Sequence, residues 1–123
     1  MGYLLVFLGG GIGAALRHAV NIAAARTLGD FPYGTLIVNV SGSIVMGLIA
    51  GYFAFKGDAS QSLRLFLTAG ILGGYTTFSA FSLDAAALYE RGEVSLAVIY
   101  VVASVLLSIA GLFAGLAIAR SFA

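Results

Sequence analysis

Polar side chains are rare in this sequence, and most of those that stand among apolar residues recur at helical spacing. Thr35, Asn39 and Ser43 are four residues apart, so in a helix they share one face. A second series with the same spacing lies nearer the C-terminus and comprises Tyr100, Ser104 and Ser108. Hydroxyl and amide groups either donate hydrogen bonds to a ligand or hold two helices together. The spacing alone leaves both interpretations open.

Enzyme chemistry finds no support in the residue types present. The chain has no Cys and a single His, His18, so thiolate chemistry and a His/Cys metal site both lack ligands. No Ser/His/Asp set, carboxylate pair or phosphate-binding loop can be assembled. The amide of Asn39, by contrast, needs several hydrogen-bond partners, and hydrocarbon supplies none. We therefore expect a protein that is not an enzyme and in which Asn39 has a specific partner.

Residues 70–82 read Gly-Ile-Leu-Gly-Gly-Tyr-Thr-Thr-Phe-Ser-Ala-Phe-Ser and predict an interrupted helix. Two adjacent glycines followed by two β-branched threonines disfavour the helical conformation. A break frees backbone carbonyl groups, which is tolerated in a membrane only where protein, water or an ion satisfies them. Such carbonyls are typical ligands of Na⁺ in membrane proteins. A helix that is merely kinked here is the alternative.

Composition indicates the elements that must carry these residues. Hydrophobic residues make up 61% of the 123 residues and charged residues only 9%, whereas a soluble domain carries roughly 25% charged residues. A soluble enzyme and a nucleic-acid-binding protein are thereby excluded. Charges and turn residues divide the chain into four stretches, each of about the 20 residues that cross a bilayer. The sequence predicts a single four-helix transmembrane domain, residues 1–123, with spans at about 3–25, 33–55, 63–89 and 94–119.

The distribution of basic residues bears on orientation. Connections are predicted at residues 29–32, 57–58 and 91–93, so the two sides of the membrane carry different loops. One side has Lys56, Arg64 and Arg120, and the other has Arg26 and Arg91, with Arg17 close to it. Orientation normally follows an excess of Lys and Arg on the cytoplasmic side, and here the sides nearly balance. Either other signals fix one orientation, or the chain inserts both ways and two opposed copies pair as an inverted repeat.

Two strings of residues resemble a known family. Residues 34–39, Gly-Thr-Leu-Ile-Val-Asn, and residues 73–82, Gly-Gly-Tyr-Thr-Thr-Phe-Ser-Ala-Phe-Ser, are similar to motifs of the Fluc (CrcB) fluoride channel family. The Gly-rich first span with Arg17 and the Tyr100/Ser104/Ser108 series extend the resemblance over essentially the whole chain. Ala80 departs from the family pattern, which carries Ser or Thr there, so one hydroxyl along the path is missing.

The resemblance implies an all-α membrane protein in which four transmembrane helices, the third broken mid-membrane, form an antiparallel dual-topology homodimer. It implies passive, fluoride-selective export across the bacterial plasma (inner) membrane, with membrane lipid as surroundings and no nucleic acid as partner. Two pores and one central structural Na⁺ belong to each dimer. The backbone carbonyls of Gly73 and Thr76 would bind the Na⁺. The resemblance assigns the fluoride pore to Asn39, Phe78, Phe81, Ser79, Tyr100, Ser104, Ser108 and Arg17.

Two rival functions belong to other classes. A small dual-topology multidrug exporter also has four helices, but proton-coupled export needs a titratable carboxylate deep in the membrane. The first span contains none, and Asp84, near the end of the third span, is expected to face water. A membrane anchor or assembly subunit without transport activity is the second rival, and it predicts no ion flux.

Overall fold

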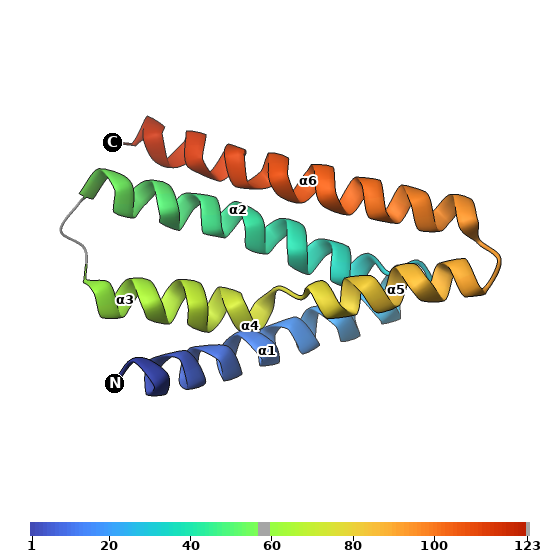
Figure 1. Cartoon of the computed structure of the whole chain (residues 1–123), viewed down its shortest axis with the longest axis horizontal. Coiled ribbons are helices and arrows are strands. Elements are labelled where there is room, and N and C mark those ends of the chain that lie inside the picture. Colours follow the sequence, from blue (N-terminus) through green and yellow to red (C-terminus); the bar gives the residue numbers. More distant parts are fainter. Residues whose placement is uncertain (57–59, 123) are drawn as a thin grey trace.

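The computed structural model describes residues 1–56 and 60–122, and within these ranges the chain is helical without a strand. Four long rods lie side by side (Figure 1), and both chain ends lie at the same end of the bundle. The first, second and fourth rods are α1 (Gly2–Thr27), α2 (Tyr33–Lys56) and α6 (Val94–Ser121). The third rod is composed in chain order of α3 (Gln61–Leu65), the π-helix η1 (Phe66–Leu72), α4 (Gly73–Tyr75) and α5 (Phe78–Glu90).

All four rods are long and apolar enough to cross a membrane. The helical segments considered as spans contain 26, 22, 30 and 28 residues, and about 20 residues suffice for a bilayer. The predicted all-helical fold with four spans is therefore confirmed, and the chain is a multi-pass membrane protein. Of the three predicted connections, the one at Gly57 and Asp58 lies outside the described residues.

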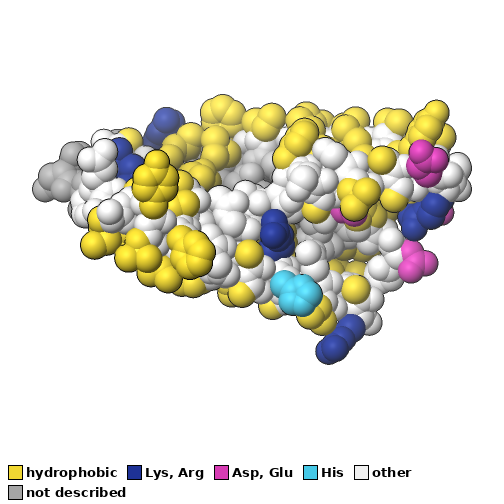
Figure 2. Space-filling view, turned by 60° about the horizontal axis from the view of Figure 1, so that its bottom comes forward, with side chains coloured by type: hydrophobic (Ala, Val, Ile, Leu, Met, Phe, Trp, Pro, Cys, Tyr) yellow, Lys and Arg dark blue, Asp and Glu magenta, His cyan; other side chains and the backbone are white. Residues whose placement is uncertain are grey.

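The outer surface has the character of a surface that faces lipid. Large hydrophobic side chains such as Tyr3, Phe7 and Leu106 are exposed on different helices. Figure 2 shows one face on which hydrophobic side chains dominate and acidic side chains gather toward one end. In water, contiguous apolar surface of this extent would drive association, whereas a bilayer accommodates it.

Two glycines shape the connections at the end of the bundle opposite the chain termini. Gly29 has φ +86° and Gly92 has φ +81°, a left-handed conformation that costs glycine little. Gly29 follows α1 and Gly92 lies between α5 and α6. The turns predicted at residues 29–32 and 91–93 are found at these positions.

Glycines also let the rods approach closely. A side chain at Gly9 would lie within 2.9 Å of the Gly70 Cα, where α1 packs on η1. On the other side of the bundle, a side chain at Gly115 would lie 2.8 Å from the Leu48 backbone nitrogen, where α6 packs on α2. Small residues at helix contacts are the usual packing device in membranes. These glycines therefore allow close packing between the helices.

Candidate ion site

The third rod is interrupted at Thr76 and Thr77. Thr76 has φ −82° and ψ 156°, and Thr77 has φ −151° and ψ 120°, so both residues are extended while α4 ends before them and α5 begins after them. β-Branched side chains favour this conformation over a helix. The Thr77 hydroxyl then accepts a hydrogen bond from the Ala80 N–H at 3.1 Å, which caps the N-terminus of α5. The break is thus built from the two threonines that disfavour a helix.

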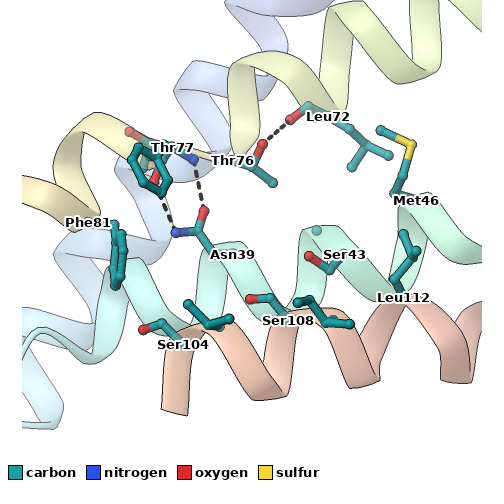
Figure 3. A pocket seen from close by; sticks show the side chains of 14 residues that line it. Asn39, Ser43, Met46, Leu72, Thr76, Thr77, Phe81, Ser104, Ser108 and Leu112 are labelled. Carbon is teal, nitrogen blue, oxygen red and sulfur yellow. Dashed lines mark hydrogen bonds between the residues drawn. The ribbon is translucent and has the colours of Figure 1, made fainter. Parts of the chain in front are cut away.

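Asn39 on α2 holds the break in place. Its Nδ2 donates to the Thr77 carbonyl at 3.0 Å, and its Oδ1 accepts from the Thr77 N–H at 2.8 Å. Figure 3 shows the Asn39 side chain reaching from α2 to Thr77 with both hydrogen bonds drawn. The amide therefore has the specific partner that its position among apolar residues required, and one Nδ2 hydrogen remains for another acceptor.

A cavity of about 390 Å³ opens beside this contact. Its walls come from α2, η1, the break, α5 and α6. The polar part of the lining consists of Asn39, Ser43, Thr76, Thr77, Ser104 and Ser108, and the aromatic part of Phe78 and Phe81. Met46, Leu72 and Leu112 are among the apolar residues at the other side of the cavity (Figure 3). None of the polar lining groups is a carboxylate, so the cavity offers hydrogen-bond donors without a fixed negative charge.

Ser104 is the most unusual of the lining residues. It is only 5% exposed, and its hydroxyl has no hydrogen-bond partner among the residues that the structure describes. Leaving a buried hydroxyl unsatisfied costs about 1–3 kcal/mol, so natural proteins seldom do so without a water or ligand at the site. Ser108, one turn further along α6, lines the same cavity and is partly buried. Ser104 and Ser108 therefore bring two hydroxyl side chains to the α6 wall of the cavity.

Three aromatic rings form a continuous row at one side of the cavity. Phe78 and Phe81 lie with their ring centroids 5.5 Å apart, and Phe81 and Tyr100 with theirs 5.3 Å apart. Phe78 is 77% exposed, whereas Phe81 is buried and Tyr100 is fully buried. The row therefore runs from the surface of the subunit into its interior.

The structure brings some of the predicted pore residues together and leaves others apart. Asn39, Phe78, Phe81, Ser104 and Ser108 line the cavity. The remaining three are Ser79, Tyr100 and Arg17, and these lie outside that lining.

Each of the three residues outside the lining has its own surroundings. The Ser79 hydroxyl is 3.3 Å from the Thr77 Oγ1, and the Tyr100 hydroxyl donates to Asp84 at 3.1 Å. Arg17 is partly buried on α1. Asp84 is partly buried and partly exposed, and one of its carboxylate oxygens accepts the hydrogen bond from Tyr100.

Gly73 and Thr76, the predicted Na⁺ ligands, both lie at the break. Gly73 begins α4 and is exposed, and Thr76 is partly buried. The Thr76 hydroxyl donates to the Leu72 carbonyl at 2.9 Å.

The sequence indicated Thr77 only as part of the break, whereas the structure shows that it also pairs with Asn39, caps α5 and lines the cavity. A Thr directly before a new apolar helix is a recognisable N-cap signal, and it could have indicated where α5 starts. The pairing of Thr77 with Asn39, however, links residues 38 positions apart, and no local pattern encodes it.

Comparison with known proteins decides the family. The family described as CrcB-like protein, Camphor Resistance (CrcB), matches residues 4–116. The chain belongs to this family. The resemblance found in the sequence is thereby confirmed for the CrcB family.

Several relatives of this CrcB chain are named as fluoride-specific ion channels. It is 70% identical to the fluoride-specific ion channel FluC of Rhodopseudomonas palustris, with 98% of each chain covered. It is 65% identical to the fluoride-specific ion channel FluC 2 of Nitrobacter hamburgensis, again over 98% of each chain. A FluC from Methylobacterium nodulans is 57% identical over 97% of this chain and 96% of its own. These relatives are named as ion channels and none of them as an enzyme, in line with the absence of catalytic residues.

Proposed function

We propose that this CrcB-family chain is a passive, fluoride-selective channel. The observation that carries the proposal is the buried, unpartnered Ser104 hydroxyl in a cavity whose polar lining holds donors and no carboxylate. Fluoride is small and tightly hydrated, so a pore must replace the water it strips away with hydrogen-bond donors. Relatives of up to 70% identity that are named fluoride-specific channels support the choice of ion.

In the proposed path, amide, hydroxyl and aromatic groups act in series. The free Nδ2 hydrogen of Asn39 and the hydroxyls of Ser104 and Ser108 donate to the ion. The rings of Phe78 and Phe81 offer their electropositive edges, because an aromatic quadrupole is negative on the face and positive at the rim. Weak contacts in series suit conduction, since a single strong site would trap the ion. Arg17 attracts anions toward the path, while Ser79 and Tyr100 border it through their contacts with Thr77 and Phe81.

The proposed working unit is an antiparallel homodimer with two pores. A single subunit leaves Phe78 exposed beside the open cavity, so a second copy is needed to close the path. The near balance of Lys and Arg between the two loop sides favours insertion in both orientations. Adding two Lys residues to one loop side is expected to fix one orientation and abolish fluoride flux when that variant is present alone. Retained flux from uniformly oriented protein would contradict antiparallel pairing.

A structural Na⁺ at the centre of the dimer fits the residues at the break. The end of a helix leaves its last carbonyl groups without helical donors, and α4 ends within this segment. Oxygen ligands suit a hard monovalent cation, and the exposed position of Gly73 leaves its backbone accessible to a partner. When bound, the Na⁺ would join the two breaks and add positive potential near both paths.

Passive transport agrees with the charges of the described residues. Asp84, at the middle of α5, is engaged by Tyr100 and lies outside the cavity lining. A proton-coupled exporter needs an accessible carboxylate in its transport path. We place the channel in the bacterial plasma (inner) membrane, where fluoride in the cytoplasm would leave down its electrochemical gradient.

The test is fluoride efflux from liposomes that hold only the purified protein, measured with and without a proton gradient. A passive channel predicts fluoride efflux that needs no proton gradient, once an ionophore removes the opposing membrane potential. Proton movement that depends on added drug would favour the multidrug exporter. Absence of any ion flux would favour the membrane anchor.

A further inference from the structure

Two backbone N–H groups near the break do not donate to the carbonyl groups that they would bond in an unbroken helix. In an α-helix each N–H donates to the carbonyl four residues earlier. The Thr77 N–H would therefore occupy the Gly73 carbonyl, and the Ala80 N–H would occupy the Thr76 carbonyl. Instead the Thr77 N–H donates to Asn39 Oδ1 at 2.8 Å, and the Ala80 N–H donates to the Thr77 hydroxyl at 3.1 Å.

We infer that Asn39 and Thr77 are positioning residues for the cation site, because their side chains take over the two N–H groups that would otherwise occupy its carbonyls. The inference rests on the proposed central Na⁺ and extends it to residues that are not ligands themselves. Asn39 acts on the Gly73 carbonyl from α2, and Thr77 acts on the Thr76 carbonyl from within the break.

The backbone groups of Thr77 are fully paired in this arrangement. Asn39 satisfies both backbone groups of Thr77, since it accepts from the N–H and donates to the carbonyl at 3.0 Å. Thr77 is only 9% exposed, so its backbone could not rely on water for partners. Protein groups therefore take up these donors at the break, and the carbonyls of Gly73 and Thr76 are left without the two N–H partners of a regular helix.

The inference also gives Asn39 two roles that experiments can separate. One Nδ2 hydrogen and Oδ1 are used at the break, and the second Nδ2 hydrogen is left for the anion path. Loss of fluoride flux in an Asn39 variant would thus not distinguish the roles. A readout of cation binding is required, and Thr77 is the better residue to change because its hydroxyl acts at the cap.

The experiment measures the thermal midpoint of the purified dimer against Na⁺ concentration, with N-methylglucamine keeping ionic strength constant and fluoride absent. Thr77→Val removes the hydroxyl at nearly constant volume, and Thr77→Ser keeps it. A ligand that binds the folded state raises its stability with concentration. We expect Thr77→Val to need about fivefold more Na⁺ than the wild type for the same rise in thermal midpoint, since the Ala80 N–H then competes for the Thr76 carbonyl with the strength of one ordinary hydrogen bond. Thr77→Ser should match the wild type.

Ser82→Ala is the matched control, because the Ser82 hydroxyl lies on the same segment and donates to the Phe78 carbonyl. It should leave the Na⁺ dependence unchanged. If Thr77→Val does not yield folded dimer, Thr77→Ala removes the same hydroxyl with less bulk, and Asn39→Leu tests the Gly73 carbonyl independently.

Each failure has its own signature. A wild type stabilised by Na⁺ together with variants at Thr77 and Asn39 that need no more Na⁺ would overturn the positioning role and leave the cation site standing. A wild type indifferent to Na⁺ would overturn the cation site and the positioning role with it.

Discussion

Helices α2 and α6 pack closely toward one end of the bundle, in a contact that we call the seam, and border the cavity further along. Toward the chain termini, Gly47 and Gly115 bring the two backbones together so closely that a Cβ at either position would meet backbone atoms of the other helix. Toward the middle, Ser104 and Ser108 of α6 border the cavity beside Asn39 of α2. The same pair of helices thus forms the closely packed seam and part of the cavity wall. Glycine stands where the helices pack closely, and serine stands where α6 borders the cavity.

A second contrast lies within the hollow region itself. Asn39 has its partner in Thr77, and Ser104 has none among the described residues. A polar group that protein satisfies stabilises the architecture, whereas one left unsatisfied in a cavity is available to a ligand. Substitutions in the seam, in the aromatic row and at the serines test this contrast between structural and ligand-facing groups.

Breaking the solid seam should have the largest effect. Gly115→Val places a side chain where the Leu48 nitrogen is 2.8 Å from the would-be Cβ, so the helices must separate. We expect destabilisation of about 3 kcal/mol or more and loss of monodisperse protein in size-exclusion chromatography. Normal yield and melting behaviour would show that the seam tolerates separation.

Changing the aromatic row should impair transport while the fold survives. Phe78→Ile and Phe81→Ile keep apolar volume but remove the electropositive ring edges. We expect fluoride efflux from liposomes to fall at least about tenfold, the equivalent of about 1.4 kcal/mol in a barrier. Size-exclusion chromatography should still report assembled protein. Efflux close to normal in both variants would remove the aromatic row from the path.

Removing the unpartnered hydroxyl should slow transport and spare stability. Ser104→Ala deletes a donor to the ion, and we expect efflux to fall about fivefold, as for the loss of one hydrogen bond of about 1 kcal/mol. The thermal midpoint should stay unchanged or rise, because an unsatisfied buried group disappears.

The matched control for Ser104 is Ser41→Ala. The Ser41 hydroxyl lies 3.0 Å from the Tyr75 hydroxyl, so its loss should lower the thermal midpoint. The efflux rate per folded protein should change by no more than about twofold, which is less than the loss of one ordinary hydrogen bond would cause. If the two variants behaved alike, the distinction between paired and unpaired groups would fail.

The smallest effect is expected at a glycine that packs against nothing. A side chain at Gly11 would have no neighbour within 4 Å, so Gly11→Ala should stabilise α1 by about 0.5–1 kcal/mol through its higher helix propensity. The thermal midpoint should rise slightly. A fall would contradict the open surroundings of Gly11 in the chain.

The sequence predicts most of the architecture because the signals are local. Apolar length sets the four spans, and glycines with β-branched residues indicate where the third rod is interrupted. The connections at Gly29 and Gly92 follow from residues that tolerate left-handed backbone. The π-helical segment η1, which packs against α1, was not predicted.

The site is less accessible to sequence reasoning because it is assembled from distant parts. Helical spacing placed Asn39 on one face of its helix and Ser104 and Ser108 on one face of theirs, and these faces border one cavity, but spacing could not reveal which residue has a protein partner. The Asn39–Thr77 pair and the Tyr100–Asp84 bond join different rods, across 38 and 16 residues. Only the three-dimensional arrangement separates a scaffold amide from an available hydroxyl.

Fluoride selectivity can be measured directly as fluoride and chloride efflux from liposomes that hold only the wild-type protein, with the membrane potential set by a potassium ionophore. A passive, fluoride-selective channel gives rapid fluoride efflux and retained chloride. Efflux of both halides at similar rates, or of neither, would contradict it.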